Sequence, residues 1–472
     1  MGGALFGGLE TALSALEAQQ AVLATTAHNV ANVNTPGYAQ EHVNLVPVPG
    51  GAAGLDQGGT PQPGNGVQVA DIQRVVSHFL NQQNWTNSGQ LAAASQDSTT
   101  LGQVQAVLNE PTASGLRNTL DAFWSAWQNL GNHPGSEAAR QQVISAGQAL
   151  ANGFATISSS WGQLQQSLNA SVGQGVLQVQ RLAGQIATLN GQIAEQQSAG
   201  QGANNLKDQR DQLISQLSQL VPVGVTQEQD GVVNIAAGSV QLVAGTQVEP
   251  LVATANTANH GFYALTWGSA SGPSAHFGSQ GGTLGALIHL RDTVVPGYSS
   301  GLDQLAGQVA GAVNTQHKAG ASLDGTVTGM AFFVPSSGTT LGASNLQVNA
   351  TLVANPQDLA AAAVPFQGPG DGSNAQAIGD LMNSPIAGGT TADGAYAALV
   401  GQIGSDAAAA TASQSNLQAL RSNLQQQIQS VSGVSINEQM TYMVQAQNAY
   451  AAAAKVTATI DQMLGDLMNM VQ

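Results

Sequence analysis

Cysteine is absent from the 472 residues of the chain. Its absence excludes disulfides, thiolate chemistry and zinc sites with cysteine ligands. Charged residues are also scarce, at 8% of the chain against about 25% in typical globular proteins. The polar surface must therefore consist of Gln, Asn, Ser, Thr and Gly. Such a surface is easily buried against identical neighbours, because few charged groups have to lose their water.

Basic residues number only ten against 26 acidic ones, which gives a net charge of −16. Scattered bases do not make the clustered footprint that nucleic acid requires, and they do not favour an anionic membrane surface. No run approaches the length of a membrane-spanning segment, which is about 18 apolar residues. The N-terminal segment carries Glu10 and Glu17 and lacks a basic region, so it is not a cleavable secretory signal. The chain either stays inside the cell or leaves by a route that reads a different signal.

Motifs for catalysis and metal binding are missing or incomplete. The eight histidines are dispersed and include no H-E-x-x-H pattern, so we expect no metal site. GYSSG at 297–301 matches the serine-hydrolase pattern G-x-S-x-G, which needs a preceding strand and then a distant acid and histidine. The acid between Ser299 and the last histidine, His317, is Asp303, which is too close along the chain. We therefore expect no enzymatic activity and no cofactor.

Both ends of the chain predict helices with apolar seams. In the first helix, over 9–30, the spacing alternates between four and three, which is typical of a coiled coil. The last helix, from 436 onward, carries an apolar stripe. The predicted seam of the two terminal helices consists of Leu9, Leu13, Leu16, Leu23, Val30, Val456, Ile460 and Leu467. With nothing local to pair with, these ends pair either with each other or with other subunits.

Further helices are predicted in the interior of the chain. The longest extends to about residue 197 and begins after Ser136, a candidate N-cap; its four-three alternation contains one stutter. A helical pattern also starts at Ile72 and includes Phe79. DQRDQ at 208–212 is typical of a solvated helix face or of salt bridges between subunits. Core positions are predicted for Trp124, Trp127 and Trp161, and a late helical seam for Leu417, Leu420, Leu424, Ile428 and Val431.

The fold class that follows is mainly α with a β-rich insert, built from nested, discontinuous domains. Residues 221–282 alternate with period two between glycines and predict the β-rich outer domain. Strands from 321–369 either extend this domain or pack with the helical domain. The helical-bundle domain takes 41–220, 283–320 and 370–434, with a β-hairpin at 38–72. The terminal domain takes 1–40 and 435–472.

The stretch HNVANVNTPGY at 28–38 predicts a firm end to the first helix. Asn32 or Asn34 can take the left-handed position after a helix. Thr35 precedes proline and is therefore disfavoured in helix. Pro36 and Gly37 suit the two central positions of a type II turn. A strand is expected to follow.

After the first helix, ANVNTPGY at 31–38 resembles the N-terminal signature of the flagellar axial protein family, which includes rod, hook and hook-associated proteins. Residues 432–470 resemble the C-terminal helix of that family. Four interior segments resemble the hook-associated members that join hook to filament: 123–151, 204–221, 281–320 and 370–382. The six segments occur in the family's order.

The resemblance implies a structural component of the bacterial flagellum that joins hook to filament by polymerising through its terminal helices. It implies that 1–40 and 435–472 are unstructured in the free monomer and fold into an inner coiled-coil tube on assembly. The motif would stop the first helix and turn the chain outward. The residues of this assembly motif are Asn29, Asn32, Asn34, Thr35, Pro36, Gly37 and Tyr38.

The resemblance also implies the partners and the location. The partners would be further copies in a ring-like assembly, the hook protein, the next hook-associated junction protein and an export chaperone. An exposed amphipathic stripe suits binding in the groove of such a chaperone; the stripe consists of Met440, Met443, Ile460, Met463 and Leu467. The location would be extracellular, after export by the flagellar type III route, with no nucleic acid or membrane as partner.

Three alternatives stay open at this point. The chain could be another axial protein, such as a hook or rod protein. It could be an unrelated coiled-coil scaffold or adhesin. The motif at 28–38 could also be an ordinary helix end followed by a hairpin.

Overall fold

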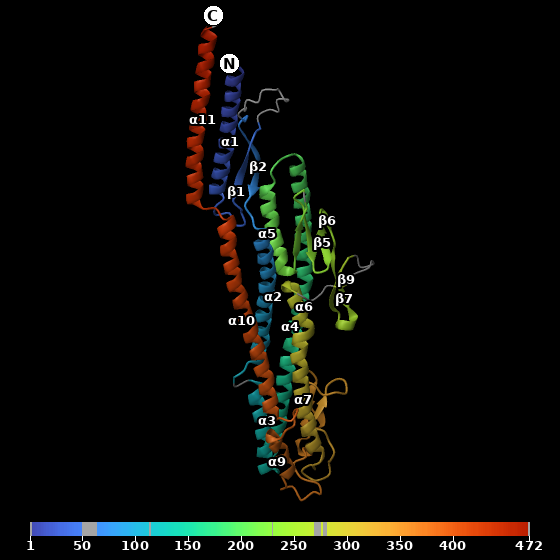
Figure 1. The fold of residues 1–472 in the computed structure, drawn as a ribbon. Coiled ribbons are helices and arrows are strands. Elements are labelled where there is room, and N and C mark those ends of the chain that lie inside the picture. Colours follow the sequence, from blue (N-terminus) through green and yellow to red (C-terminus); the bar gives the residue numbers. More distant parts are fainter. Residues whose placement is uncertain are drawn as a thin grey trace.

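The computed structural model describes residues 2–49, 64–112, 115–228, 230–268, 275–276 and 281–470. It is an elongated, mainly helical molecule with small sheets, as the sequence predicts (Figure 1). The helices are α1 (Gly2–Ala31), α2 (His78–Leu108), α3 (Leu116–Asn132), α4 (Glu137–Ser198), α5 (Asn204–Leu220), α6 (Gly282–His289), α7 (Val295–Lys318), α8 (Ala350–Ala354), α9 (Ser373–Gly379), α10 (Ala392–Ser432) and α11 (Ile436–Met470). Short helical turns lie at η1 (Thr257–Asn259), η2 (Leu290–Val294), η3 (Pro356–Asp358) and η4 (Asp380–Asn383).

The strands of the described residues form four small antiparallel sheets. Their bounds are β1 (Glu41–Pro47), β2 (Val67–Arg74), β3 (Gly224–Gln227), β4 (Val233–Ala237), β5 (Val240–Ala244), β6 (Gln247–Val248), β7 (Leu251–Asn256), β8 (Phe262–Trp267), β9 (Ala275–His276), β10 (Phe333–Pro335) and β11 (Leu346–Val348). The pairs are β1 with β2, β3 to β6 in order, β7 to β9 in order, and β10 with β11.

The two ends of the chain lie side by side. Helices α1 and α11 form an antiparallel pair at one end of the molecule, and the β1–β2 hairpin packs on α1 (Figure 1). A Cβ added to Gly8 would lie 3.3 Å from Ile460 Cδ1, and at the other end of the pair the Asn29 amide donates to Gln439 Oε1 at 3.0 Å. Within one chain, α1 and α11 are therefore packed against each other.

The centre of the molecule is a bundle around the 62-residue helix α4. The four-three alternation of the sequence is buried along its length, including the stutter at Val172 and Val176. Ser136 caps the helix, because its side chain accepts a hydrogen bond from the Ala139 N–H at 3.3 Å. Local sequence therefore determined both the start of α4 and the face that it buries.

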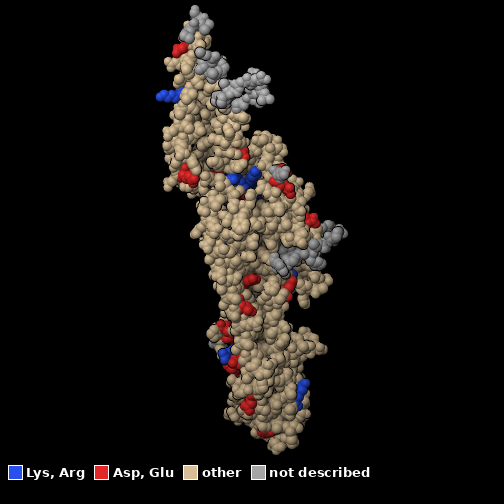
Figure 2. Space-filling view, in the orientation of Figure 1, with Lys and Arg blue, Asp and Glu red and all other residues tan. Residues whose placement is uncertain are grey.

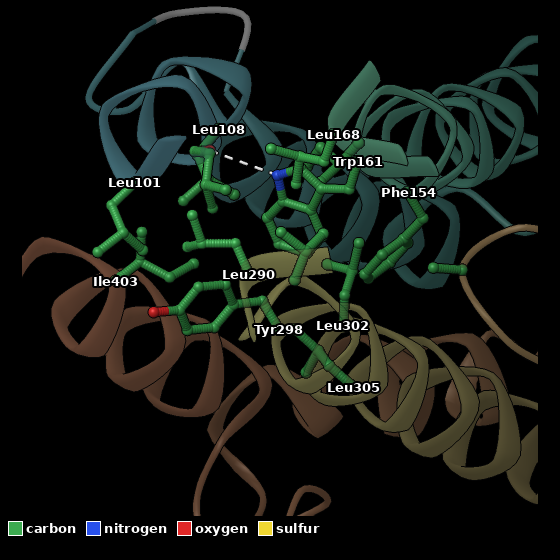
Figure 3. Packing of buried hydrophobic residues seen from close by; sticks show 14 of the residues in the cluster. Leu101, Leu108, Phe154, Trp161, Leu168, Leu290, Tyr298, Leu302, Leu305 and Ile403 are labelled. Carbon is green, nitrogen blue, oxygen red and sulfur yellow. Dashed lines mark hydrogen bonds between the residues drawn. The ribbon is translucent and has the colours of Figure 1, made fainter. Parts of the chain in front are cut away.

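Tryptophan side chains occupy the core of this bundle, as predicted. Trp124, Trp127 and Trp161 are 2%, 0% and 0% exposed. Figure 3 shows Trp161 between α2 and α7, close to Leu108 and Leu302. Its indole N–H donates to a backbone oxygen of α2 at 3.4 Å, which satisfies the polar end of the ring.

One predicted helical pattern is wrong, and a second is only partly right. The helix expected from Ile72 begins at His78, because β2 continues to Arg74 in register with β1 and Ser77 caps α2; Phe79 is 70% exposed. In the predicted seam of α10, Leu424 is buried, but Leu420 and Val431 are 45% and 42% exposed. Helix α10 packs mainly on α2 and also on α7, and the residues on its other faces stay open.

The predicted β-rich segment 221–282 contains β3 to β9. The strands within 321–369 do not extend those sheets. Strands β10 and β11 pair only with each other and pack on α4 and α7. The side-chain amide of Asn314, on α7, binds both backbone groups of Phe333 in β10. Its nitrogen donates to Phe333 O at 2.8 Å, and its oxygen accepts from the Phe333 N–H at 2.8 Å. These strands therefore belong to the helical bundle.

His317 makes the stability of this bundle depend on pH. The ring is fully buried, contacts Met330 O at 2.7 Å and accepts from the Ala360 N–H at 3.1 Å. Burial lowers the pKa of His317 from 6.5 to about 4, although the Met330 carbonyl opposes this. Because the folded pKa lies below the ordinary value, the stabilisation is complete above pH 6.5 and is lost as the pH falls toward 4. It amounts to about 3 kcal/mol.

We expect His317→Gln to flatten the loss of unfolding free energy between pH 7 and pH 4. Urea denaturation at both pH values would measure it. The exposed His133 provides the matched control, since His133→Gln should keep the slope of the parent chain. A His317→Gln variant with the parent's slope would contradict the assignment.

Candidate functional site: the junction of the terminal helices with the bundle

The serine-hydrolase pattern has no catalytic geometry. Ser299 lies inside helix α7 rather than on a turn between a strand and a helix. Asp303 accepts a hydrogen bond from the Ala343 N–H at 2.8 Å, and His317 is sealed in the core. Within the described part of the chain, no group of three or more His, Asp or Glu side chains could hold a metal ion. The described helices also include none that is long and apolar enough to cross a membrane.

The motif at 28–38 forms the turn that the sequence predicts. The Tyr38 N–H donates to Thr35 O at 3.2 Å, and Gly37 has φ +80°. Pro36 and Gly37 thus occupy the centre of the turn, and only glycine takes that φ without strain. A Cβ at Gly37 would also overlap the Gln212 side chain of α5.

The asparagines do not have the predicted left-handed backbone. Among the described residues other than glycine, only Asn109 and His260 have positive φ. Asn32 acts through its side chain: its amide donates to His28 O at 3.0 Å and accepts from the Thr35 hydroxyl at 3.1 Å. Asn34 is exposed. Side-chain hydrogen bonds and the glycine therefore end the helix, in place of a left-handed asparagine.

Asn29 is the hydrogen-bonding centre of the motif and is only 2% exposed. Its amide nitrogen donates to Glu41 O at 2.9 Å and to Gln439 Oε1 at 3.0 Å. Its oxygen accepts from the Tyr38 hydroxyl at 2.7 Å and from the Glu41 N–H at 2.9 Å. One buried side chain thus ties together α1, the start of β1 and α11.

A buried ion cluster fastens the hairpin to α5. Arg74, at the end of β2, donates to Asp208 at 2.6 Å and to Asp211 at 2.8 Å. Asp208 also accepts from the Ala39 N–H at 3.4 Å, and Gln212 donates to Pro36 O. Burial raises the pKa of Asp208 to about 6, while Arg74 and the Ala39 N–H lower it. The chain just after the motif is therefore bound to α5 through these carboxylates.

The expectation of a solvated face at 208–212 is wrong for the two best-buried members. Asp208 and Arg210 are 7% and 2% exposed, and their contacts lie within one chain. The sequence carried a usable signal, since Asp208 and Asp211 are three residues apart and share one helix face. It did not indicate which guanidinium they would hold, because Arg74 lies far away along the chain.

The terminal helices leave much of the predicted seam uncovered. Leu13 and Val456 are 52% and 50% exposed, whereas Ile460 is 7% exposed. The half-buried members are Leu9, Leu16, Leu23, Val30 and Leu467. In α1 the fully covered positions are mostly small or polar, and they are Ala12, Ala18, Thr25, Thr26 and Asn29.

The predicted stripe of α11 is divided between two surfaces. Ile460 is buried and Met443 and Leu467 are half-buried, but Met440 and Met463 are 47% and 42% exposed. Among the described elements, helix α11 packs chiefly on α1, so residues off that face stay open.

Exposed apolar side chains concentrate on this helix pair. Of the seventeen large hydrophobic side chains exposed among the described residues, nine are Phe6, Leu13, Ile436, Met440, Tyr442, Val444, Val456, Met463 and Met468. Helices α1 and α11 contribute only 30 and 35 residues. Such a concentration is typical of a surface that contacts another protein.

Comparison with known families assigns the three parts of the chain separately. Residues 101–333 match the model described as flagellar hook-associated protein FlgK helical domain. Residues 9–38 match that of the flagella basal body rod protein. Residues 425–470 match that of the flagellar basal body rod FlgEFG protein C-terminal. The last two matches cover most of α1 with its motif and the end of α10 with α11.

Individual proteins are similar over the whole length. The chain is 32% identical to flagellar hook-associated protein 1 of Bacillus subtilis, over 98% of both chains. It is 27% identical to the protein of that name from Escherichia coli, over 98% of this chain and 99% of that one. The fold is similar to the flagellar hook junction protein FlgK from Burkholderia pseudomallei, with a TM-score of 0.65 at 20% identity, covering 74% of this chain and 100% of that one.

We expect Arg74→Met to loosen the junction strongly, because Asp208 and Asp211 would remain buried without their cation. Breaking a buried ion pair from one side costs about 3–5 kcal/mol. Hydrogen exchange of the β2 and α5 amides would measure the change. The control is Arg117→Met, which breaks an ion pair with Asp393 that is 57% and 36% exposed and should cost less than about 1 kcal/mol. Equal effects of the two substitutions would show that the cluster does not hold the junction.

Proposed function

Because the chain belongs to the family of flagellar hook-associated protein 1 and is a structural component of the junction between hook and filament, we propose that it joins the two by polymerising through its terminal helices. The resemblance found in the sequence is confirmed by the relatives that match it over nearly the full length. The readings as a hook protein, a rod protein or an unrelated scaffold are set aside on the same ground.

The observation that carries this proposal is the concentration of exposed apolar side chains on α1 and α11. The helical bundle covers its own core, whereas the terminal pair does not. Leu13, for example, belongs to a seam with coiled-coil spacing and is 52% exposed. A seam of this kind is stable in water only when another helix covers it. We infer that helices of neighbouring subunits supply the cover.

The distribution of family matches supports the same division of labour. The segments 9–38 and 425–470 match models of rod proteins, so they are the part shared with other axial components. The helical domain at 101–333 matches the hook-associated model. We propose that the shared ends bind the axial assembly and that the bundle gives the junction its particular form. We propose three domains. The terminal domain takes 1–40 and 435–472, the helical-bundle domain takes 41–220, 283–320 and 370–434, and the β-rich outer domain takes 221–282.

Assembly is proposed to complete the folding of the terminal segments, 1–40 and 435–472. Within the described part of one chain, α1 and α11 pack chiefly on each other and on the hairpin. Ordering such segments costs several kcal/mol, which burial in the assembly offsets. The assembly motif then fixes where the helix stops and how the chain enters the bundle.

The proposed partners are further copies of the chain, the hook protein and the next hook-associated junction protein. The proposed location is extracellular, reached by the flagellar type III route. The low content of charge supports burial between subunits, since few ions would lose water (Figure 2).

An export chaperone is proposed to bind the stripe on α11 before assembly. In the paired state Ile460 packs against α1 near Gly8. The same side chain cannot contact a chaperone and α1 at once. Chaperone binding and assembly therefore exclude one another, which would keep the exported chain from polymerising early.

Leu13→Glu is expected to abolish co-sedimentation of the chain with isolated hooks. A charge placed in the seam would have to be buried without a partner, which costs several kcal/mol. The thermal unfolding of the bundle should stay unchanged, since Leu13 is exposed in one chain. Leu177→Glu is the matched control, because Leu177 is 67% exposed on α4 and lies outside the terminal pair.

A second version, lacking 1–40 and 435–472, should also fail to pellet with hooks. Pelleting of that truncated chain would overturn the proposed role of the terminal helices. Pelleting of Leu13→Glu at the level of the parent would overturn the role of the leucine seam.

Saturating export chaperone is expected to keep the chain in the supernatant when hooks are added. Ile460→Asp should abolish chaperone binding, measured by calorimetry, whereas Val444→Asp, an exposed position outside the stripe, should not. A complex of chaperone, chain and hook in the pellet would contradict mutual exclusion.

A further inference from the structure

A cleft with an unusual share of the positive charge lies where the hairpin meets the bundle. Its volume is about 880 Å³, and its walls come from β2, the start of α2, the loop before α5, α5 itself and the edge of β3 and β4. Three of the ten Lys and Arg residues of the chain, Arg74, Lys207 and Arg210, line it. Figure 2 shows basic side chains gathered on one face just below the terminal pair, beside acidic ones.

Arg210 is buried in the wall of this cleft with part of its guanidinium unused. It is 2% exposed, and one terminal nitrogen donates to Asn190 Oδ1 at 3.2 Å and to Gly231 O at 2.7 Å. Its Nε has no hydrogen-bond partner among the described residues, and Asp211 Oδ1 lies 4.0 Å away. A buried N–H donor without an acceptor is costly. Because this Nε is closed to solvent, it adds positive charge to the wall of the cleft rather than a direct contact for a ligand.

Lys207 provides a positive charge that forms no direct ion pair with a carboxylate of the described residues. It is half-buried. The acids that line the cleft are engaged elsewhere: Asp211 accepts from Arg74 at 2.8 Å, and Asp71 from Gln73 at 2.6 Å. Burial lowers the pKa of Lys207, and the neighbouring Arg74 and Arg210 lower it further, while Asp211 opposes the shift. An additional anion would relieve this repulsion.

The N-terminus of α5 adds to the field of the cleft. Its cap residue, Ala203, offers no side-chain hydrogen bond, and Ala203 and Asn204 both line the cavity. Helix N-termini carry partial positive charge and free N–H groups. The uncapped N-terminus of α5, Lys207 and Arg210 all make the cleft electrically positive. A positive cleft favours an anionic ligand, and in a protein partner that ligand is a carboxylate.

We propose that this cleft binds a carboxylate from the terminal helix pair of a neighbouring copy of the chain. The inference rests on the proposed function, because it needs subunits packed side by side through their ends. The pair has the complementary charge: its five exposed acids are Glu10, Glu17, Glu438, Asp461 and Asp466. Against these five, the helices α1 and α11 carry Lys455 as their single Lys or Arg. The cleft is lined by β2, and β2 packs on α1 of the pair. We infer that a subunit packed alongside through its ends presents these carboxylates to the cleft.

The test is co-sedimentation of the full-length chain with isolated hooks at low and high salt. Lys207→Glu is expected to lower the apparent affinity about tenfold at low salt, and Lys207→Gln to lower it less in the same direction. Both effects should shrink at high salt. Lys318→Glu, at an exposed lysine on the last turn of α7, makes the same charge change away from the cleft and should behave like the parent. Unchanged thermal unfolding would show that the variants fold.

The neighbouring carboxylate is then identified by charge reversal. Each of the five acids is changed to Lys in the Lys207→Glu chain, and one of these reversals should restore binding. Loss of binding that none of the five restores would assign the cleft to another flagellar protein and overturn the proposal. Normal binding of Lys207→Glu would also overturn it, while leaving the proposed function intact if the chain lacking both ends still fails to pellet.

Discussion

The clamp of Arg74 between Asp208 and Asp211 is the interaction on which the arrangement of the molecule depends. In a chain with so few charges, it brings a guanidinium and two carboxylates together at 2.6 and 2.8 Å. Around it, the backbone just after the turn, the end of the hairpin and α5 are fixed to one another. The Gln40 N–H also donates to Ser432 O at 2.8 Å, which brings in the end of α10. The terminal pair therefore enters and leaves the bundle at one fixed point.

The two parts that meet at this point are stabilised in different ways. The bundle buries tryptophans, phenylalanines and leucines around α4, and its buried histidine and arginine side chains find hydrogen-bond partners within the chain. The terminal pair buries mainly alanine, threonine and asparagine on α1 and leaves larger apolar side chains in water. Small buried residues contribute little hydrophobic free energy each. The pair is therefore the part of the fold that gains most from contact with neighbouring subunits.

The low charge content fits both the junction and the assembly. Amide and hydroxyl side chains can be buried between subunits if their hydrogen bonds are met, which costs less than burying ions. The remaining charges then stand out by position. Three bases gather in the cleft beside the junction, while exposed acids are spread along the terminal helices. Electrostatic complementarity of this kind fixes the register of contacts between subunits more than it adds affinity.

The sequence by itself determined the features that depend on neighbouring residues. Ser136 caps α4, the Pro36–Gly37 pair makes the turn, and the spacing of apolar residues gives α4 its buried face. The shared motif and its order along the chain were also enough to indicate the family. Each of these follows from bonds or periodicities that span a few residues.

Only the tertiary structure decided which faces are covered and which distant groups meet. Periodicity shows which residues share a face but not whether a neighbour lies against it. For that reason the stripe of α11 was divided between Ile460, which is buried, and Met440, which is exposed. Burial of Asp208 required Arg74 from another element, and the buried role of Asn29 required Gln439 from the opposite end of the chain. Such contacts join residues far apart in sequence, so no local pattern contains them.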